Sequence, residues 1–202
     1  MEAITIYDFL YLQVPSSMNF PIESLETDRL RLVSPDVKYA QDVYDYSKDS
    51  EFCRFIDAPP ASNLAESAKF IESLIQEAHI KKRFYWLIIE KNLEKAIGTL
   101  GFIFSSPRHH GVFDFGYGLS RKHWGTGLFQ EASNAVLKYG FNSLHAQRIQ
   151  IYTREDNTAS IKSVQKLGFK KEAVLEDFYQ TNEGRINSVL LRLLKDEFLK
   201  RQ

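Results

Sequence analysis

The 202 residues of the chain predict one domain, with room for a terminal extension. Hydrophobic residues at 44% and charged residues at 26% are ordinary globular values, which argues against a disordered or fibrous protein. Lys and Arg number 26 together and so do Asp and Glu, and this net charge of zero argues against recruitment of nucleic acid or an anionic membrane by global electrostatics.

The first part of the chain predicts a strand and two helices after a lead-in over residues 1–24. Asp28–Val33 alternates charged and apolar residues, which suits a half-buried strand. Pro35–Asp49 predicts a helix, because proline in the first helical turn loses no hydrogen bond. A second helix is expected to start at the cap Ser62 or Asn63 and to run to about residue 81, since its apolar residues recur at helical spacing.

The rest of the chain alternates β-rich runs with two amphipathic helices, and this order predicts a single mixed α/β domain. The expected strands are Phe84–Glu90, Ala96–Phe104, Val112–Ser120, Gln147–Thr153, Phe169–Leu175 and Asn187–Leu194. The expected helices run from Leu128 to about Tyr139 and from Asn157 to Leu167, the second closed by Gly168, because glycine tolerates the left-handed conformation of a helix end.

Cys53 is the only cysteine, so the chain forms no internal disulfide and no cysteine-based zinc site. The five histidines show no H-E-x-x-H spacing, and we predict no metal. The N-terminus has no early Lys or Arg, and no apolar run approaches the ~18 residues of a membrane span. We therefore expect a soluble, cytoplasmic protein.

The most informative stretch is Lys122-His-Trp-Gly125-Thr-Gly127-Leu128, where a strand runs through two glycines into a helix. Glycine lets the backbone approach a ligand closely, and the free N–H groups of a helix start favour phosphate. No glycine is followed by Lys, which excludes a Walker loop, and Gln130 stands where a dinucleotide fingerprint needs its third glycine. The stretch predicts a diphosphate site of another kind.

This stretch resembles the pyrophosphate loop of the GCN5-related N-acetyltransferase (GNAT) superfamily. The loop has Gln or Arg, two residues, Gly, one residue and Gly or Ala, and here Lys122 takes the first position before Gly125 and Gly127. The blocks around it resemble the ribosomal-protein N-terminal acetyltransferase (RimJ/RimL-like) subgroup, over about residues 25–198. Those blocks are Glu26–Leu32 ("TxRLxLR"), Phe115–Tyr117 ("IGY"), His123–Glu131 ("YWGxGYxxEA") and Asn157–Phe169 ("NxxSxxxxxKxGF").

The resemblance implies a GNAT fold over residues 25–202 behind the extension 1–24. Its mixed sheet of about seven strands is splayed between two parallel central strands and flanked by about four helices. The implied cosubstrate, acetyl-CoA, binds in the split between Val112–Ser120 and Gln147–Thr153. The implied cofactor-binding residues are Leu119, Ser120, Lys122, His123, Trp124, Gly125, Thr126, Gly127, Leu128 and Asn157.

By the same resemblance, Ser160 is the general acid that protonates the departing thiolate. The base is ambiguous, because the subgroup's catalytic carboxylate falls on Tyr179, with Asp177 nearby as the second candidate. Glu131 matches a subgroup position but is more simply structural at a helix start. His109 and His110 are weaker candidates for the acceptor cleft.

These features imply an acyltransferase that passes an acetyl group to a primary amine in a ternary complex. Our first expectation for the acceptor is a protein or peptide N-terminal amine. The alternative is a small amine such as an amino sugar, polyamine, amino acid or antibiotic, and a lesser alternative is a non-catalytic acyl-CoA-binding module. Homodimers are common in the subgroup, so a homodimer is an open expectation.

Overall fold

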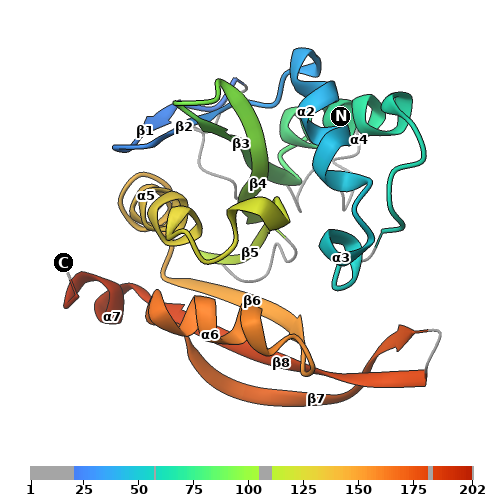
Figure 1. The fold of residues 1–202 in the computed structure, drawn as a ribbon. Coiled ribbons are helices and arrows are strands. Elements are labelled where there is room, and N and C mark those ends of the chain that lie inside the picture. The colour runs from blue at the N-terminus through green and yellow to red at the C-terminus, as the bar shows by residue number, and fades with distance from the viewer. Residues whose placement is uncertain (1–20, 57, 105–110, 182–183, 202) are drawn as a thin grey trace, which may run out of the picture.

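The computed structural model describes residues 21–56, 58–104, 111–181 and 184–201. These residues form one eight-stranded sheet with helices on both faces (Figure 1). The strand order is β1-β2-β3-β4-β5-β6-β8-β7, and every neighbouring pair is antiparallel except β5 and β6. The expected mixed α/β architecture is therefore confirmed.

The element bounds lie close to the expected ones. The strands are β1 (Leu25–Glu26), β2 (Leu30–Val33), β3 (Arg83–Glu90), β4 (Lys95–Ile103), β5 (Val112–Leu119), β6 (Arg148–Arg154), β7 (Lys170–Thr181) and β8 (Gly184–Leu194). The helices are η1 (Val37–Tyr39), α2 (Ala40–Ser47), α3 (Ser50–Cys53), α4 (Leu64–His79), η2 (Arg121–His123), α5 (Leu128–Asn142), α6 (Thr158–Lys166) and α7 (Lys195–Leu199). The elements beyond the expected seven strands and four helices are all short, because two to five residues carry too little periodicity to be recognised in a sequence.

Two hydrophobic clusters occupy the two faces of the sheet. Trp86 and Ile88 of β3 belong to the larger cluster, which contains the buried residues of α5, α6 and α7. Leu87 and Ile89 belong to the smaller cluster with α2 and α4. Because side chains alternate along a strand, one fully buried strand supplies both clusters and fixes the two helical layers around the sheet.

The two largest departures from the expected bounds have local causes. The expected helix Pro35–Asp49 is divided into η1 and α2, and Asp36 caps the first turn by accepting a hydrogen bond from the Lys38 N–H. The last hairpin is longer than expected, because β7 continues to Thr181 past a register shift between Leu175 and Tyr179. That bulge interrupts the alternation by which a strand is recognised.

The chain joins the larger core at Ile22, which is buried. The Ile22 N–H donates to Ser34 Oγ over 2.6 Å, and the Trp86 indole N–H donates to the Glu23 carbonyl over 2.8 Å. The division at residue 24 stays a prediction, and residues 1–20 lie outside the described residues. Among the described residues, no helix is long and apolar enough to cross a membrane.

Candidate functional site

The two parallel strands separate shortly after they meet. β5 and β6 pair only from Val112↔Arg148 to Asp114↔Gln150, although β5 continues to Leu119 and β6 to Arg154. Within the described chain, the facing edges beyond Asp114 and Gln150 therefore have no strand partner. Strand β4 holds β5 and strand β8 holds β6, so the sheet opens as a V between them (Figure 1).

On one face of the V, two hydroxyl groups meet across the opening. Tyr117 Oη of β5 and Ser160 Oγ of α6 lie 2.5 Å apart in a hydrogen bond. The Tyr117 ring packs against Phe129 of α5 with 4.6 Å between centroids. Burial raises the pKa of Tyr117 to about 12, against a smaller lowering by the Ser160 hydrogen bond, so the phenol keeps its proton at neutral pH.

Ser160 is held in place by the start of its own helix. Asn157 is the N-cap of α6, and its side-chain oxygen accepts a hydrogen bond of 3.2 Å from the Ser160 N–H. This capping bond fixes the first turn of α6, so the Ser160 hydroxyl points at β5 rather than at solvent. Asn157 and Ser160 therefore lie together at this helix start, beside Tyr117, and their roles stay predictions.

The glycine stretch forms an exposed turn at the start of α5. Gly125 has a φ of 76° and Gly127, the N-cap of α5, has a φ of 83°, a backbone conformation that favours glycine. The Thr126 hydroxyl donates to the His123 carbonyl over 2.7 Å and so closes the turn. The first N–H groups of a helix have no acceptor inside it, and in α5 the Leu128 N–H has only the Thr126 hydroxyl, at 3.5 Å. The start of α5 therefore suits an anion.

The residues before the glycines have different environments. Trp124 is 49% exposed, and its indole N–H donates to the Leu119 carbonyl over 2.7 Å. The side chains of Leu119 and Ser120 are buried, and the Ser120 N–H donates to the Ile97 carbonyl of β4. These contacts anchor the entrance of the turn to the sheet.

The two basic residues expected near a phosphate have different surroundings: Lys122 faces solvent and His123 faces the sheet. Lys122 is exposed, whereas His123 is half-buried with Nε2 lying 3.1 Å from Glu90 Oε2 of β3. His123 therefore ties η2 to β3, and Lys122 is the residue of this pair that is open to a ligand.

A brace from the other end of the chain holds the glycine turn. Glu131 of α5 accepts hydrogen bonds from the Thr27 hydroxyl (2.6 Å) and the Arg29 N–H (2.8 Å), and forms an ion pair with the Arg29 side chain (2.7 Å). Arg29 also donates to the Thr126 carbonyl over 3.2 Å. Burial alone would raise the pKa of Glu131, but these hydrogen bonds outweigh it and lower the pKa below 4.5. Glu131 is therefore a structural carboxylate.

The opposite face of the V carries a polar row that the sequence did not single out. Gln150 of β6 donates to Asp114 Oδ1 of β5 over 2.8 Å and to the Tyr152 hydroxyl over 3.1 Å. Tyr85 of β3 reaches the same face, because a Cβ on Gly116 would lie 1.8 Å from Tyr85 Oη. The signal was the alternation of β5, which sends Asp114 to the face opposite the buried Phe113 and Phe115.

Residues 50–55, which contain α3 and which we call the α3 segment, lie over the open end of the V on this second face. A Cβ on Gly118 would lie 3.0 Å from the Phe52 ring, so that ring packs directly on β5. Arg154, at the end of β6, donates to the Arg54 carbonyl over 3.4 Å and lies over the Phe55 ring at 5.3 Å. The segment therefore bridges the ends of the two diverging strands.

The expected base region lies at the sheet edge. Asp177 is exposed in the β7 bulge with a φ of 52°, and its N–H donates to Asn187 Oδ1 over 3.1 Å. The neighbouring Phe178 ring stacks on Tyr152 of the polar row with 5.8 Å between centroids, and Tyr179 contacts Phe178 at 5.1 Å. Of the bulge side chains, the Phe178 ring is the one that stacks on the row. Roles for Asp177 and Tyr179 as base stay predictions.

His109 and His110 lie outside the described residues. In the part of the chain that the structure describes, no group of three or more His, Cys, Asp or Glu side chains is arranged to hold a metal ion.

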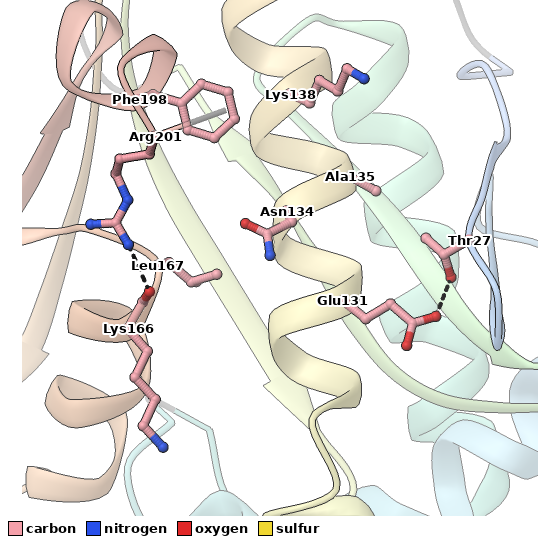
Figure 2. A pocket seen from close by; sticks show the side chains of 9 residues that line it. All are labelled: Thr27, Glu131, Asn134, Ala135, Lys138, Lys166, Leu167, Phe198 and Arg201. Carbon is pink, nitrogen blue, oxygen red and sulfur yellow. Dashed lines mark hydrogen bonds between the residues drawn. The ribbon is translucent and has the colours of Figure 1, made fainter.

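A groove of about 540 Å³ runs along α5 (Figure 2). We call it the α5–α7 groove. Its residues come from α5, from the turn between β1 and β2, and from the ends of α6 and α7: Thr27, Glu131, Asn134, Ala135, Lys138, Lys166, Leu167, Phe198 and Arg201.

A family model and the related proteins agree on one family. Residues 29–170 match the model of the acetyltransferase (GNAT) domain. The uncharacterized N-acetyltransferase p20 of Bacillus licheniformis is 30% identical over 177 residues, which is 88% of this chain and 99% of that protein.

Solved structures share the fold. The microcin C7 self-immunity acetyltransferase MccE, solved with acetyl-CoA and AMP, has a TM-score of 0.72 at 25% identity over 83% of this chain and 93% of its own. A ribosomal-protein-S5-alanine acetyltransferase from Vibrio fischeri has a TM-score of 0.74 at 20% identity over 87% of this chain and 98% of its own.

The Glu131 brace predicts a pH-dependent loss of stability in Glu131→Gln. A carboxyl whose pKa is lowered by folding stabilises the fold above its unfolded pKa, and that contribution is lost as the pH falls through the folded value. At about pH 7 the free energy of unfolding of the variant should be about 1–2 kcal/mol lower than that of the wild type, and this difference should shrink below about pH 4.5. Urea unfolding of both proteins at the two pH values measures the difference. Glu72→Gln on the exposed side of α4 is the control, and a difference that does not change with pH would contradict the brace.

Proposed function

This chain belongs to the acetyltransferase (GNAT) domain family, and from that premise we propose that it transfers an acetyl group from acetyl-CoA to the primary amine of a small molecule. The observation that carries the proposal is the V between β5 and β6, which gives two separate approaches to one point. One face presents the glycine turn and a hydroxyl pair, and the other presents the polar row with the Asp114 carboxylate.

The first face fits an extended anionic thioester. The exposed Gly125–Gly127 turn leads into the N-terminus of α5, which suits a diphosphate, and the exposed Lys122 adds positive charge nearby. The unpaired edge of β5 beyond Asp114 offers backbone hydrogen bonds to a pantetheine arm, as an added strand would receive them. The thioester end would then lie near the point where the V closes, beside Tyr117 and Ser160.

The chemical step needs one proton supplied and one removed. The amine nitrogen attacks the thioester carbonyl carbon, a C–N bond forms, and the C–S bond breaks with the electron pair leaving on sulfur. The Tyr117–Ser160 pair is the proton source for that thiolate, because the phenol is protonated at neutral pH. A thiol of pKa ~8.5 leaves readily, so this contribution is at the low end of general-acid effects, roughly 10²-fold.

The second face suits the acceptor amine. Asp114 stands on the last paired register before the V opens, so its carboxylate would lie near a thioester that ends where the V closes. It can hold an ammonium group and take up the proton that the attacking amine loses. Since a carboxylate is a weak base at neutral pH, the site favours an amine of pKa ~8 over a lysine-like amine of ~10.4.

The covered mouth favours a small acceptor over a polypeptide. The contacts of Arg154 with Arg54 and Phe55 bridge the ends of β5 and β6, and this cover favours a compact acceptor over an extended chain. The rings of Phe52, Tyr152 and Phe178 offer apolar surface to a compact molecule instead. In the related MccE structure, the small molecule AMP accompanies acetyl-CoA on the same fold.

An acceptor panel tests this function. Free thiol released from acetyl-CoA is followed with two pools, one of peptides with varied N-termini and one of amino sugars, polyamines, amino acids and aminoglycosides. We expect release with small amines and little with peptides. Release with peptides alone would overturn the small-acceptor proposal in favour of a protein N-terminus, and absence of CoA binding in a thermal shift would overturn both.

Removal of the acid pair should slow turnover and spare cosubstrate binding. Tyr117→Phe and Ser160→Ala should each lower kcat about tenfold to 100-fold with an unchanged Kd for CoA, because the lost proton is needed only as sulfur leaves. The double variant should be little slower than either single one, since the two hydroxyls act as one unit. Tyr139→Phe is the control, because it removes a partly buried hydroxyl from α5, away from the pair, and it should leave kcat unchanged. Full activity of both single variants would contradict the assignment.

Asp114→Asn should weaken use of the amine. The change keeps the hydrogen-bond partner of Gln150 but removes the charge, so kcat/KM for the amine should fall at least about tenfold while the Kd for CoA is unchanged. Asp196→Asn, on the exposed side of α7, is the control. An unaltered kcat/KM in Asp114→Asn would remove this carboxylate from the acceptor site.

A further inference from the structure

A chain of hydrogen bonds enters the polar row of the second face from the start of β6. Arg148, the first residue of β6, donates from Nε to Gln150 Oε1 over 2.7 Å. Gln150 in turn donates from Nε2 to Asp114 Oδ1 over 2.8 Å and to the Tyr152 hydroxyl over 3.1 Å. The Gln150 amide therefore joins a guanidinium to the carboxylate that is proposed to meet the acceptor amine.

Arg148 holds the Gln150 amide in one orientation and one place. A guanidinium has N–H donors and no acceptor, so the amide atom that faces it is the carbonyl oxygen. The amide nitrogen then faces Asp114, and its two hydrogens match the two acceptors that it meets. A glutamine side chain keeps much rotamer freedom when only one end of its amide is bonded. Because both ends are bonded here, the Asp114 carboxylate meets a fixed N–H group.

Glu172 of β7 holds Arg148 in turn. Arg148 Nη1 donates to Glu172 Oε1 over 3.0 Å, and Nη2 donates to Oε2, so the ion pair is bidentate. Glu172 stands at the register shift between Lys171 and Ala173, which makes it the extra residue of a β-bulge. A bulge re-aims a side chain. This one accompanies an ion pair that reaches across β8, since β8 lies between β6 and β7 in the sheet.

The same ion pair compensates the charge of Arg148. A guanidinium without a partner beside Asp114 would compete with an ammonium group for that carboxylate. The hydrogen bond from Arg148 lowers the pKa of the Glu172 carboxyl, against a smaller rise from desolvation, so Glu172 is ionised at neutral pH. The charge of Arg148 is therefore balanced by Glu172, and Arg148 can hold Gln150 without drawing on the Asp114 charge.

From these contacts we propose that Arg148 is a positioning residue of the acceptor site, which holds Asp114 through the Gln150 amide and is itself held by Glu172. The inference rests on the proposed function, because that function assigns Asp114 to the amine. Asp114 and Gln150 face each other on the last paired register of β5 and β6, so the amide acts where the V opens. Arg148 acts through Gln150 and takes no part in proton transfer.

NMR of the full chain tests the holding of the amide without any substrate. The side-chain NH2 signal of Gln150 is assigned by its absence from Gln150→Leu. Its two hydrogens are bonded in the wild type, and their exchange with water should be at least about tenfold faster in Arg148→Met. Arg148→Lys, whose ammonium also has only donors, should exchange nearly as slowly as the wild type. Arg31→Met is the matched control, because it removes an Arg–Glu ion pair from β2, and it should change nothing.

Kinetics measure the consequence for the amine. The assay uses acetyl-CoA with the amino sugar glucosamine, or with the panel amine that releases thiol fastest. Arg148→Met and Gln150→Leu should each lower kcat/KM for the amine about fivefold to tenfold, because Asp114 is then less well placed, with an unchanged Kd for CoA. In an Asp114→Asn background, Arg148→Met should cause no further loss, since the group that it positions has lost its charge. Arg31→Met should keep the wild-type kcat/KM.

Other outcomes overturn the proposal in distinguishable ways. Slow exchange of the Gln150 hydrogens in Arg148→Met, or an unaltered kcat/KM in both Arg148→Met and Gln150→Leu, would refute the positioning role. Losses that multiply in the double variant with Asp114→Asn would reduce Arg148 to a general structural role.

Thermal unfolding checks that each variant is folded. Gln150→Leu keeps the Arg148–Glu172 ion pair, so its kcat/KM decides the question where Arg148→Met does not fold. Turnover of no small amine, or an unaltered kcat/KM in Asp114→Asn, would refute the proposed function instead. The NMR comparison would then still decide whether Arg148 holds the amide.

Discussion

The parallel pairing of β5 with β6 is the constraint on which the rest of the site depends. Three registers join the two halves of the sheet, and each strand is then held by a different antiparallel neighbour. An open strand edge inside a sheet is normally costly, because its backbone groups need partners. Here the opening is framed by α5 and α6 on one face and by the α3 segment on the other, which turns an incomplete sheet into a site with two entrances.

The glycine turn gains its fixed shape from a segment far away in the sequence. Glycines at positive φ are conformationally free in the unfolded chain and give no rigidity of their own. The Thr27–Arg29 turn supplies that rigidity through Glu131 and the Thr126 carbonyl, across about a hundred residues. The turn is thus held in one shape, and a ligand that bound its backbone N–H groups would need less ordering of the loop.

Charge is distributed unevenly in a chain with no net charge. Lys122 and the cations of the α5–α7 groove lie on one side of the sheet. Asp114 lies on the other side, in a polar row where Arg148 also donates to Gln150. Composition alone, with equal numbers of acids and bases, gives no indication of this separation.

The sequence by itself determined the family, the order of the long elements and the local features of the site, including the Gly125–Gly127 turn, the Asn157 cap and the position of Ser160 in a first turn. These depend on periodicity and on residues within about one helical turn of each other. Tertiary structure decided which side chains from distant elements meet: Tyr117 with Ser160, Asp114 with Gln150, and Glu131 with Arg29. Sequence patterns could not supply those pairs, because each depends on where the β5–β6 ladder stops and on how the helices pack around it.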